Sequence, residues 1–141
     1  MKFVIDASAM LAWCFDDERP RGADALLEKL VQGGMMAPAH WPLELANIIW
    51  NSEIKKRLSM ADAQSFLQVV ESLSIVIDSE TPRRAWNDIL RLARSEKLTA
   101  YDAAYLELAL RKRATLVSKD RELLAAAKRC SVPTINVELK Q

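Results

Sequence analysis

The stretch Lys2-Phe3-Val4-Ile5-Asp6-Ala7-Ser8 decides how the rest of the chain is interpreted. Its three consecutive apolar residues, Phe3 to Ile5, are typical of a strand that is buried on both faces. The strand ends in a carboxylate, Asp6, and the sequence after it has helical character. Open α/β sheets bind ligands at the carboxyl ends of their strands, which makes Asp6 a candidate functional residue. The alternative is that Asp6 only caps the next helix, because aspartate is a favoured N-cap.

Size and composition indicate one globular domain over residues 1–141. Half of the residues are hydrophobic and 28% are charged, and the formal net charge of +1 lacks the basic excess of many nucleic-acid-binding proteins. No apolar run approaches the roughly 20 residues of a membrane span, and Asp6 interrupts any signal-peptide core. Cys14 and Cys130 support neither a zinc site nor a disulfide framework. These features predict a cytoplasmic location and no membrane partner.

Short apolar segments alternate with helical segments along the whole chain. Strands are expected at residues 3–5, 35–38, 74–78, 114–117 and 133–137. Helices are expected at residues 7–15, 21–32, 41–56, 60–72, 81–95, 99–112 and 120–130, with a polar loop at 16–20. Gly33-Gly34 is expected to end the second of these helices, and Ser59 to cap the fourth. This alternation predicts a three-layer α/β fold, with about seven helices around a five-strand, mostly parallel sheet.

Three further carboxylates fall near the edge of the sheet that carries Asp6. Asp120 follows the fourth predicted strand, and Glu44 lies in the first turns of the helix after the second strand. Asp102 lies in the first turn of the helix that precedes the fourth strand. Crossover helices run antiparallel to the strands, so this helix begins at the carboxyl edge of the sheet. The four acids are therefore expected to converge on one rim.

Each of these acids also has a purely structural interpretation. Thr99 and Asp102 match a capping box, Asp120 is a plausible N-cap, and Glu44 could be an ordinary solvated helix residue. The helix of Glu44 is apolar over most of its circumference, and Glu44 and Asn47 belong to a narrow polar stripe. Such a stripe on a mostly buried helix favours a position facing a cleft.

Converging carboxylates repel one another, by about 4 kcal/mol for a pair 4 Å apart at a protein-like dielectric. Either some pKa values rise or a divalent cation binds between them. Ligands that are all oxygen select Mg²⁺ or Mn²⁺ over zinc. Such a site can activate a water and hold a phosphate oxygen, as in metal-assisted phosphodiester hydrolysis. The hydroxyls of Ser8 and Ser118 would orient the ligands or the water.

The ordered series of motifs resembles the PIN-domain ribonucleases, and within them the VapC-type toxins of bacterial type II toxin–antitoxin pairs. The motifs are Val4-Ile5-Asp6-Ala7-Ser8, Pro42-Leu43-Glu44-Leu45-Ala46-Asn47, residues 99–109 and Ser118-Lys119-Asp120. The resemblance covers essentially the whole chain. It implies a PIN-like sheet in the order 3-2-1-4-5, Mg²⁺- or Mn²⁺-dependent endoribonuclease activity, homodimerisation and inhibition by a cognate antitoxin.

The resemblance also implies roles for individual residues. The catalytic and metal-binding acids would be Asp6, Glu44, Asp102 and Asp120, with accessory polar positions at Ser8, Asn47, Thr99 and Ser118. The substrates implied are structured RNAs with single-stranded loops, in which bases are accessible. Candidates to hold RNA, on position alone, are Lys119, Arg121, Lys55, Lys56 and Arg57.

The histidine and the tryptophans are expected to be structural. His40 fits a structural or peripheral position better than a catalytic one. The four tryptophans are expected in the core or at an interface, such as a dimer seam or an antitoxin groove. They are Trp13, Trp41, Trp50 and Trp86.

Other classes of α/β protein also carry acids at the sheet rim. A receiver-like signalling or binding module needs adjacent acids after the first strand and an aspartate after the third. Asp78 meets the second requirement, but Glu44 and Asp102 then have no role. A haloacid-dehalogenase-like phosphatase needs an aspartate where Ser8 stands. A catalytically silent PIN protein that acts only by partner binding is a further alternative, and the complete set of acids argues against it.

Overall fold

The computed structural model describes residues 1–15 and 21–138, so the loop predicted at 16–20 lies outside the described residues. The strands are β1 (Phe3–Ile5), β2 (Met35–Ala37), β3 (Val76–Ile77), β4 (Thr115–Ser118) and β5 (Thr134–Asn136). The helices are α1 (Ala7–Met10), α2 (Ala23–Gly33), α3 (Trp41–Ile54), α4 (Met60–Ser72), α5 (Thr81–Arg84), α6 (Leu90–Glu96), α7 (Ala100–Lys112) and α8 (Arg121–Arg129). A 3₁₀ turn (Leu11–Trp13) extends α1, and a π-helical turn (Ala85–Ile89) joins α5 to α6.

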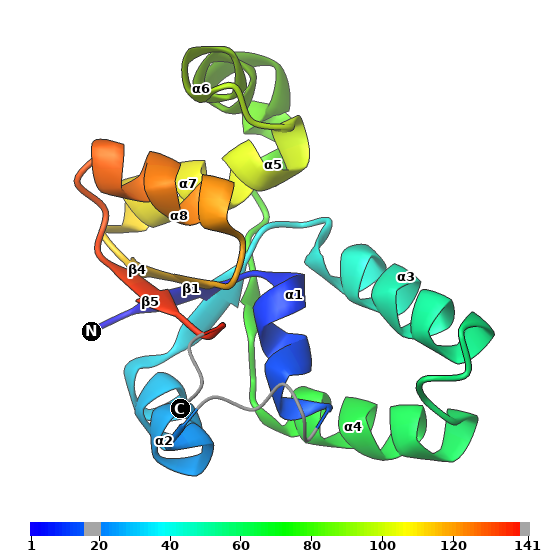
Figure 1. The fold of residues 1–141 in the computed structure, drawn as a ribbon. Helices are drawn as coiled ribbons and strands as arrows, with labels where there is room; N and C mark the ends of the chain where they lie inside the picture. Colours follow the sequence, from blue (N-terminus) through cyan, green and yellow to red (C-terminus); the bar gives the residue numbers. More distant parts are fainter. Residues whose placement is uncertain (16–20, 139–141) are drawn as a thin grey trace.

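The five strands form one parallel sheet in the order β3-β2-β1-β4-β5, which confirms the expected fold. Counting contiguous helices once, the described residues contain seven helical segments. Figure 1 shows α7 and α8 over one face of the sheet and α2 over the other, so the sheet is the middle of three layers. Right-handed crossovers of this kind bring the carboxyl ends of all the strands to one edge.

The position of Asp6 follows from the central place of β1 in this sheet. Phe3 pairs with Met35 on one side and with Thr115 on the other. The three residues of β1 are almost fully buried, as their apolar run predicts. The backbone N–H of Asp6 donates to the carbonyl of Val117 at 3.1 Å, so the carboxyl group emerges beside the end of β4.

Three predicted helix starts are confirmed by side-chain caps. Ser59 Oγ accepts the backbone N–H of Asp62 at the start of α4. Thr99 Oγ1 accepts that of Asp102 at the start of α7. Asp120 caps α8 in the same way. Each cap satisfies backbone donors that the first turn of a helix leaves unpaired.

Gly33 and Gly34 end α2, as predicted, for two different reasons. A Cβ atom on Gly33 would lie 2.1 Å from the carbonyl oxygen of Met1 and 2.5 Å from the Phe3 ring, so only glycine lets α2 pack this closely against the start of β1. Gly34 has φ +92°, a backbone conformation that other residues rarely adopt.

The third strand and the long helix after it differ from expectation. The strand predicted at 74–78 is reduced to Val76 and Ile77, which are 64% and 39% exposed at the edge of the sheet. β-branched residues favour a strand but do not specify whether it is covered. The helix predicted at 81–95 contains the π-helical turn at Ala85–Ile89.

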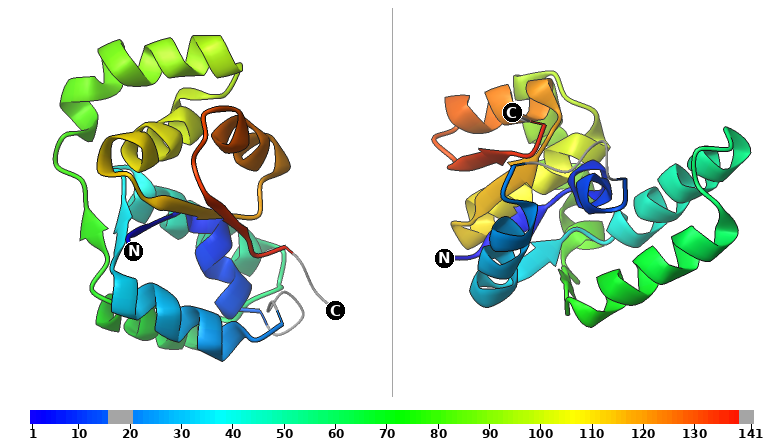
Figure 2. Two further views of the ribbon diagram at one scale, coloured as in Figure 1. Left: turned by 90° about the vertical axis from the view of Figure 1, so that its left-hand side faces the viewer. Right: turned by 60° about the horizontal axis from the view of Figure 1, so that its bottom comes forward.

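The expectation that α3 is mostly buried is wrong. Helices α3 and α4 extend together as an arm to one side of the sheet (Figure 2), so α3 packs through one side only. Leu43 is 75% and Trp50 59% exposed. Trp86 is 89% exposed, so Trp50 and Trp86 are not core residues, whereas Trp13 and Trp41 are. None of the helices in the described part of the chain is long and apolar enough to cross a bilayer.

Candidate active site

The Asp6 carboxyl group is buried and held by three donors. Its Oδ1 accepts the backbone N–H of Ala9 at 2.7 Å and the hydroxyl of Ser8 at 3.0 Å. Its Oδ2 accepts the hydroxyl of Ser118 at 2.5 Å. Asp6 therefore does cap α1, but it is also tied across the sheet to β4. Burial raises the pKa of Asp6 to about 6, although hydrogen bonds from Ser118, Ala9 and Ser8 oppose the rise.

Ser118 links Asp6 to Asp120. The same hydroxyl that donates to Asp6 accepts the backbone N–H of Asp120 at 3.0 Å. The Oδ1 atom of Asp120 in turn accepts the backbone N–H groups of Glu122 and Leu123 at 2.9 and 3.1 Å. The ends of β1 and β4 are thus connected by a continuous hydrogen-bonded chain that fixes both aspartates.

Asp102 faces this pair from the first turn of α7. Its carboxyl group is half-buried, and burial raises its pKa to about 6, with further contributions from the charges of Asp120, Asp6 and Glu44. Among the described residues, no ion pair involves Asp6, Asp102 or Asp120. The topology therefore brings the predicted acids within electrostatic reach of one another without compensating cations from that part of the chain.

Two residues orient Glu44. Tyr105 lies near it only in the folded chain, and His40 precedes it by one helical turn. The hydroxyl of Tyr105 donates to Glu44 Oε1 at 2.5 Å, and His40 Nε2 lies 3.4 Å from the same oxygen. Burial, together with the hydrogen bond to Glu44, raises the pKa of Tyr105 above its ordinary value and keeps the donor protonated. The sequence reasoning missed Tyr105. A tyrosine on the apolar face of α7 was the available signal, because a buried phenol needs a hydrogen-bond partner.

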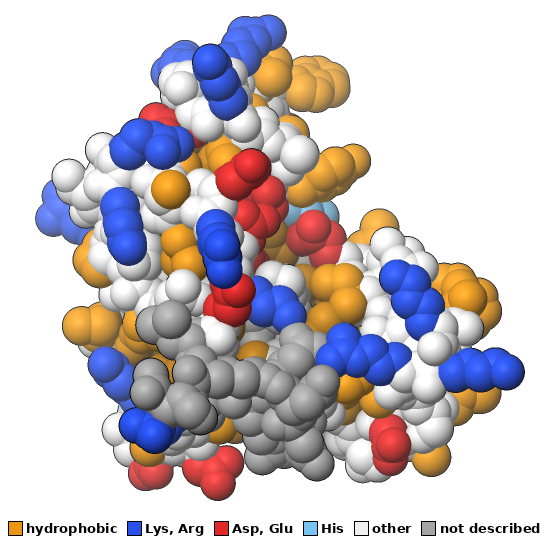
Figure 3. All heavy atoms as spheres, viewed as in Figure 1, with side chains coloured by type: hydrophobic (Ala, Val, Ile, Leu, Met, Phe, Trp, Pro, Cys, Tyr) orange, Lys and Arg blue, Asp and Glu red, His pale blue; other side chains and the backbone are white. Residues whose placement is uncertain are grey.

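Two of the predicted RNA-contacting residues border the acids. Lys119 and Arg121 line a surface hollow of about 510 Å³ together with Ser8 and Asp120. Arg121 is exposed and donates to the Glu138 carboxylate at 3.2 Å. Figure 3 shows acidic side chains gathered beside the hollow that separates α7 and α8 from α3, with lysine and arginine side chains around them.

Asn47 lies on the other side of the acids. It is exposed on α3 and lines a second hollow of about 510 Å³ with Leu43, Glu44 and Trp50. The polar stripe of α3 therefore does reach the site, although the helix that carries it is not mostly buried.

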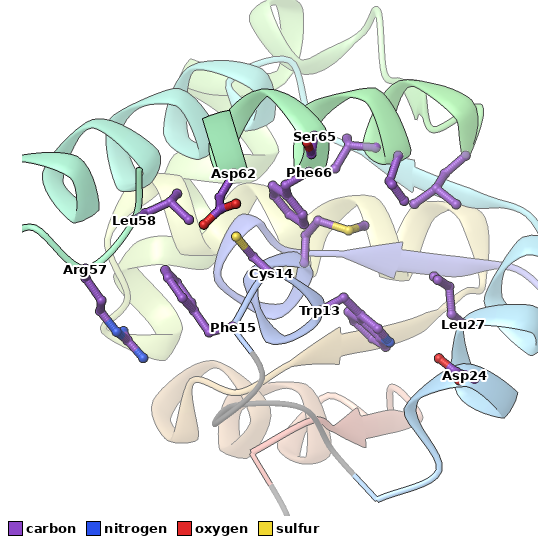
Figure 4. A pocket seen from close by; sticks show the side chains of 14 residues that line it. Trp13, Cys14, Phe15, Asp24, Leu27, Arg57, Leu58, Asp62, Ser65 and Phe66 are labelled. Atoms are coloured by element: carbon purple, nitrogen blue, oxygen red, sulfur yellow. The ribbon is translucent and has the colours of Figure 1, made fainter. Parts of the chain in front are cut away.

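The structure does not bring Lys55, Lys56 and Arg57 to the acids. They follow the end of α3, roughly 15 Å along the helix from Glu44. The guanidinium carbon of Arg57 lies 4.0 Å from the centre of the Phe15 ring. Figure 4 shows Arg57 and Phe15 at a separate cavity of about 680 Å³, whose wall also includes Trp13 and residues of α2 and α4.

Asp78, the residue that a receiver-like module would use, is engaged elsewhere. Arg111 Nη2 lies 2.6 Å from its Oδ2, and Glu107 shares the same guanidinium. Burial opposes ionisation of Asp78, but hydrogen bonds from Arg111 and the backbone of Glu80 hold its pKa below its ordinary value. A carboxylate held in this way is poorly placed to accept a phosphoryl group.

The chemistry of the acid cluster fits a hard divalent cation. Carboxylate and hydroxyl oxygens are the ligands that Mg²⁺ prefers. Within residues 1–15 and 21–138, no three acidic, histidine or cysteine side chains lie close enough to hold one ion directly. Mg²⁺ is commonly held by one or two carboxylates and several waters, so the donor set suits an ion that keeps much of its hydration shell.

Several known proteins are similar to this chain in sequence or in fold. A family model described as "PIN domain" matches residues 3–129. The protein named Ribonuclease VapC3 of Pyrobaculum aerophilum is 28% identical over 123 residues, which cover 87% of this chain and 92% of that protein. The crystal structure of PAE2754 from Pyrobaculum aerophilum matches with a TM-score of 0.70 and 27% identity, covering 98% of this chain and 90% of that one. FitAcB from Neisseria gonorrhoeae matches in fold alone, with a TM-score of 0.62 and 16% identity over 96% of this chain and 97% of that one.

Proposed function

The chain belongs to the PIN domain family, and from this premise we propose that it is an Mg²⁺- or Mn²⁺-dependent endoribonuclease, the toxin of a type II toxin–antitoxin pair. The proposal is supported by the placement of Asp6, Glu44, Asp102 and Asp120 near one edge of the sheet, where the charges of the other three acids add to the burial that raises the pKa of Asp102. The similarity to a protein named Ribonuclease VapC3 supports the same class of activity.

The proposed metal ligands are Asp6 and Asp102, directly or through water. Glu44 and Asp120 would complete the coordination through water or position the nucleophile. When bound, the ion supplies a water of lowered pKa and a positive charge opposite the phosphate oxygens. Ionised carboxylates that repel one another in its absence favour its binding.

The protein's own contribution is to hold these carboxylates in place. Ser8, Ser118 and the backbone of Ala9 fix the rotamer of Asp6, and Thr99 fixes the start of the helix that carries Asp102. Tyr105 on α7 fixes the Glu44 carboxyl group on α3 through its hydroxyl. Groups that are oriented before the substrate arrives need no reorganisation during the reaction, which is the main source of electrostatic catalysis.

The proposed substrate is a structured RNA with a single-stranded loop. Lys119 and Arg121 would contact its phosphates, and their position at the hollow that contains Asp120 supports this role. The proposed protein partners are a cognate antitoxin and a second copy of the chain, in the cytoplasm. Large apolar side chains exposed on α3 and after α5 suit such contacts; they are Leu43, Trp50 and Trp86.

The test is cleavage of a structured RNA pool by the purified, antitoxin-free protein in MnCl₂, MgCl₂ or EDTA. Asp6→Asn and Asp102→Asn are expected to reduce the rate about 100-fold or more, since each removes a charged ligand oxygen. The matched control is Asp62→Asn, which makes the same change at the exposed start of α4. Circular dichroism verifies that each variant is folded.

Cleavage that persists in EDTA, or equal rates for Asp102→Asn and Asp62→Asn, would contradict the metal-dependent mechanism. No cleavage of any structured RNA by folded wild-type protein would contradict the nuclease assignment and favour the silent, partner-binding alternative.

A further inference from the structure

Tyr101 is an exposed aromatic residue in the first turn of α7, a helix that is buried from Ala103 to Ala109. Its side chain is 64% exposed, whereas Tyr105, one turn later on the same face of α7, is 1% exposed. Tyr105 uses its hydroxyl to hold Glu44, but within the described residues the Tyr101 hydroxyl makes no hydrogen bond. Neither burial nor hydrogen bonding therefore accounts for the presence of an aromatic side chain at position 101.

His40 holds Tyr101 in place. The Nε2 atom of His40 lies 3.2 Å from the Tyr101 carbonyl oxygen, and the two ring centres are 5.6 Å apart at 55°. His40 also packs edge-on against Tyr105, at 5.3 Å. The imidazole thus contacts both the backbone and the ring of Tyr101, which restricts the ring and reduces the conformational entropy lost when a ligand packs on it.

The location of the ring relates it to the acids. Tyr101 immediately precedes Asp102, and its support, His40, lies 3.4 Å from Glu44 Oε1. In the absence of a bound cation these two carboxylates repel phosphate groups, so attraction between charges cannot by itself hold a nucleic acid there. A nucleobase is uncharged, and aromatic side chains bind single-stranded bases by stacking with little dependence on sequence.

We propose that Tyr101, supported by His40, is a stacking platform for an unpaired base of single-stranded RNA beside the acid cluster. This inference rests on the proposed function and adds a substrate-binding residue to it. It also gives His40 a positioning role, which specifies the structural or peripheral role expected from the sequence.

The test measures binding of a fluorescein-labelled ten-nucleotide oligo(A) by fluorescence anisotropy in EDTA, with a gel to verify that the RNA stays intact. Tyr101→Ala is expected to weaken binding about 5- to 150-fold, the range for loss of one stacked base. Tyr101→Phe is expected to retain wild-type affinity, because the ring and not the hydroxyl makes the contact. Tyr101→Leu keeps apolar bulk without the ring and is expected to behave as Tyr101→Ala.

Two controls separate stacking from other effects. Met60→Ala removes a large, 72% exposed apolar side chain from the start of α4, which contributes none of the four acids, and it is expected to bind as wild type. An oligomer of the same length without bases is expected to bind wild type and Tyr101→Ala equally.

Equal affinity of the wild type and Tyr101→Ala for oligo(A), or no binding by wild type, overturns the inference. A changed oligomeric state of Tyr101→Ala in sedimentation overturns it as well, because the ring then belongs to a protein interface. Cleavage assays distinguish this inference from the proposed function. Metal-dependent cleavage with the same KM for wild type and Tyr101→Ala would reject only the stacking platform. Tyr101-dependent binding without any cleavage rejects only the nuclease.

Discussion

At the residue scale, the Asp6 carboxyl group combines a structural and a proposed catalytic use. It caps α1, joins β1 to β4 through Ser118, and belongs to the acid cluster. A carboxylate that is 5% exposed is costly to ionise, and the two hydroxyls and one N–H around it offset only part of that cost. Residues placed for function commonly reduce stability in this way.

The first prediction concerns the pH dependence of stability. An aspartate in the unfolded chain titrates near 3.8, whereas Asp6 in the folded protein titrates at about 6, so the folded state binds the extra proton between these values. The free energy of unfolding should therefore fall as the pH rises from about 4 to 6 and stay level above that range. The loss from Asp6 alone is about 3 kcal/mol, and Asp102 acts in the same direction.

Urea unfolding without metal, at steps between pH 4 and pH 7.5, measures this slope. Asp6→Asn should flatten it and be more stable than wild type at pH 7.5, whereas Asp62→Asn should keep it. Asp78, whose pKa is lowered, contributes below about pH 4 and leaves this range unaffected. A stability that rises steadily from pH 4 to 6 would contradict the prediction.

The second prediction concerns Tyr105 as a positioning residue. Tyr105→Phe removes the donor to Glu44 Oε1 and leaves that oxygen near His40 only. Loss of such an orienting partner typically lowers metal affinity or activity about 10- to 100-fold. We expect the Mn²⁺ concentration for half-maximal cleavage to rise, with little change in KM for RNA. An unchanged Mn²⁺ requirement would show that Glu44 does not act through the metal.

At the scale of elements, the two ends of α7 have different roles. Its first turn carries Asp102, and its last turn carries Arg111, which binds Asp78 after β3 and Glu107 one turn earlier. This ion-pair network ties the exposed edge strand of the sheet to α7, which covers one of its faces. The sequence did not predict this network, because Asp78 and Arg111 are 33 residues apart.

The third prediction concerns this network. Arg111→Met leaves the Asp78 and Glu107 carboxylates buried without their shared cation, whose own side chain is 13% exposed. Breaking a buried ion pair at one partner typically costs about 3 to 5 kcal/mol. Thermal and urea unfolding should show this loss, whereas Lys112→Met, at the exposed neighbouring position, should change stability little. Equal stability of the two variants would mean that the network is solvent-screened.

At the scale of the whole molecule, the proposed metal links the active site to global stability. A ligand that binds only the folded state stabilises it by about 2.7 kcal/mol at 100 times its Kd. Screening of the mutual repulsion of the acids is the physical origin of this effect.

The fourth prediction concerns the effect of the metal ion on the Tm. Millimolar MnCl₂ should raise the Tm of wild type by several degrees relative to EDTA, at about 2–4 °C per kcal/mol for a chain of this size. Asp102→Asn should lose most of this shift, and Asp62→Asn should keep it. The same shift in all three proteins would indicate that the ion binds outside the acid cluster.

The sequence by itself determined the succession of elements, the caps at Ser59, Thr99 and Asp120, and the glycine end of α2. These features depend on residues within a turn or two of one another, so local periodicity and hydrogen-bonding capacity specify them. The sequence also indicated that the four acids lie near the carboxyl edge of the sheet, because parallel topology is implied by alternating strands and helices.

Only the tertiary structure decided which side chains meet across the chain. Tyr105 holds Glu44 from 61 residues away, Arg57 packs on Phe15 and not at the acids, and Trp50 is exposed on the α3 arm. An apolar stripe shows that a helix face can be buried, but not whether another element reaches it. The physical reason is that burial and long-range pairing depend on how the layers pack, and no local pattern carries that information.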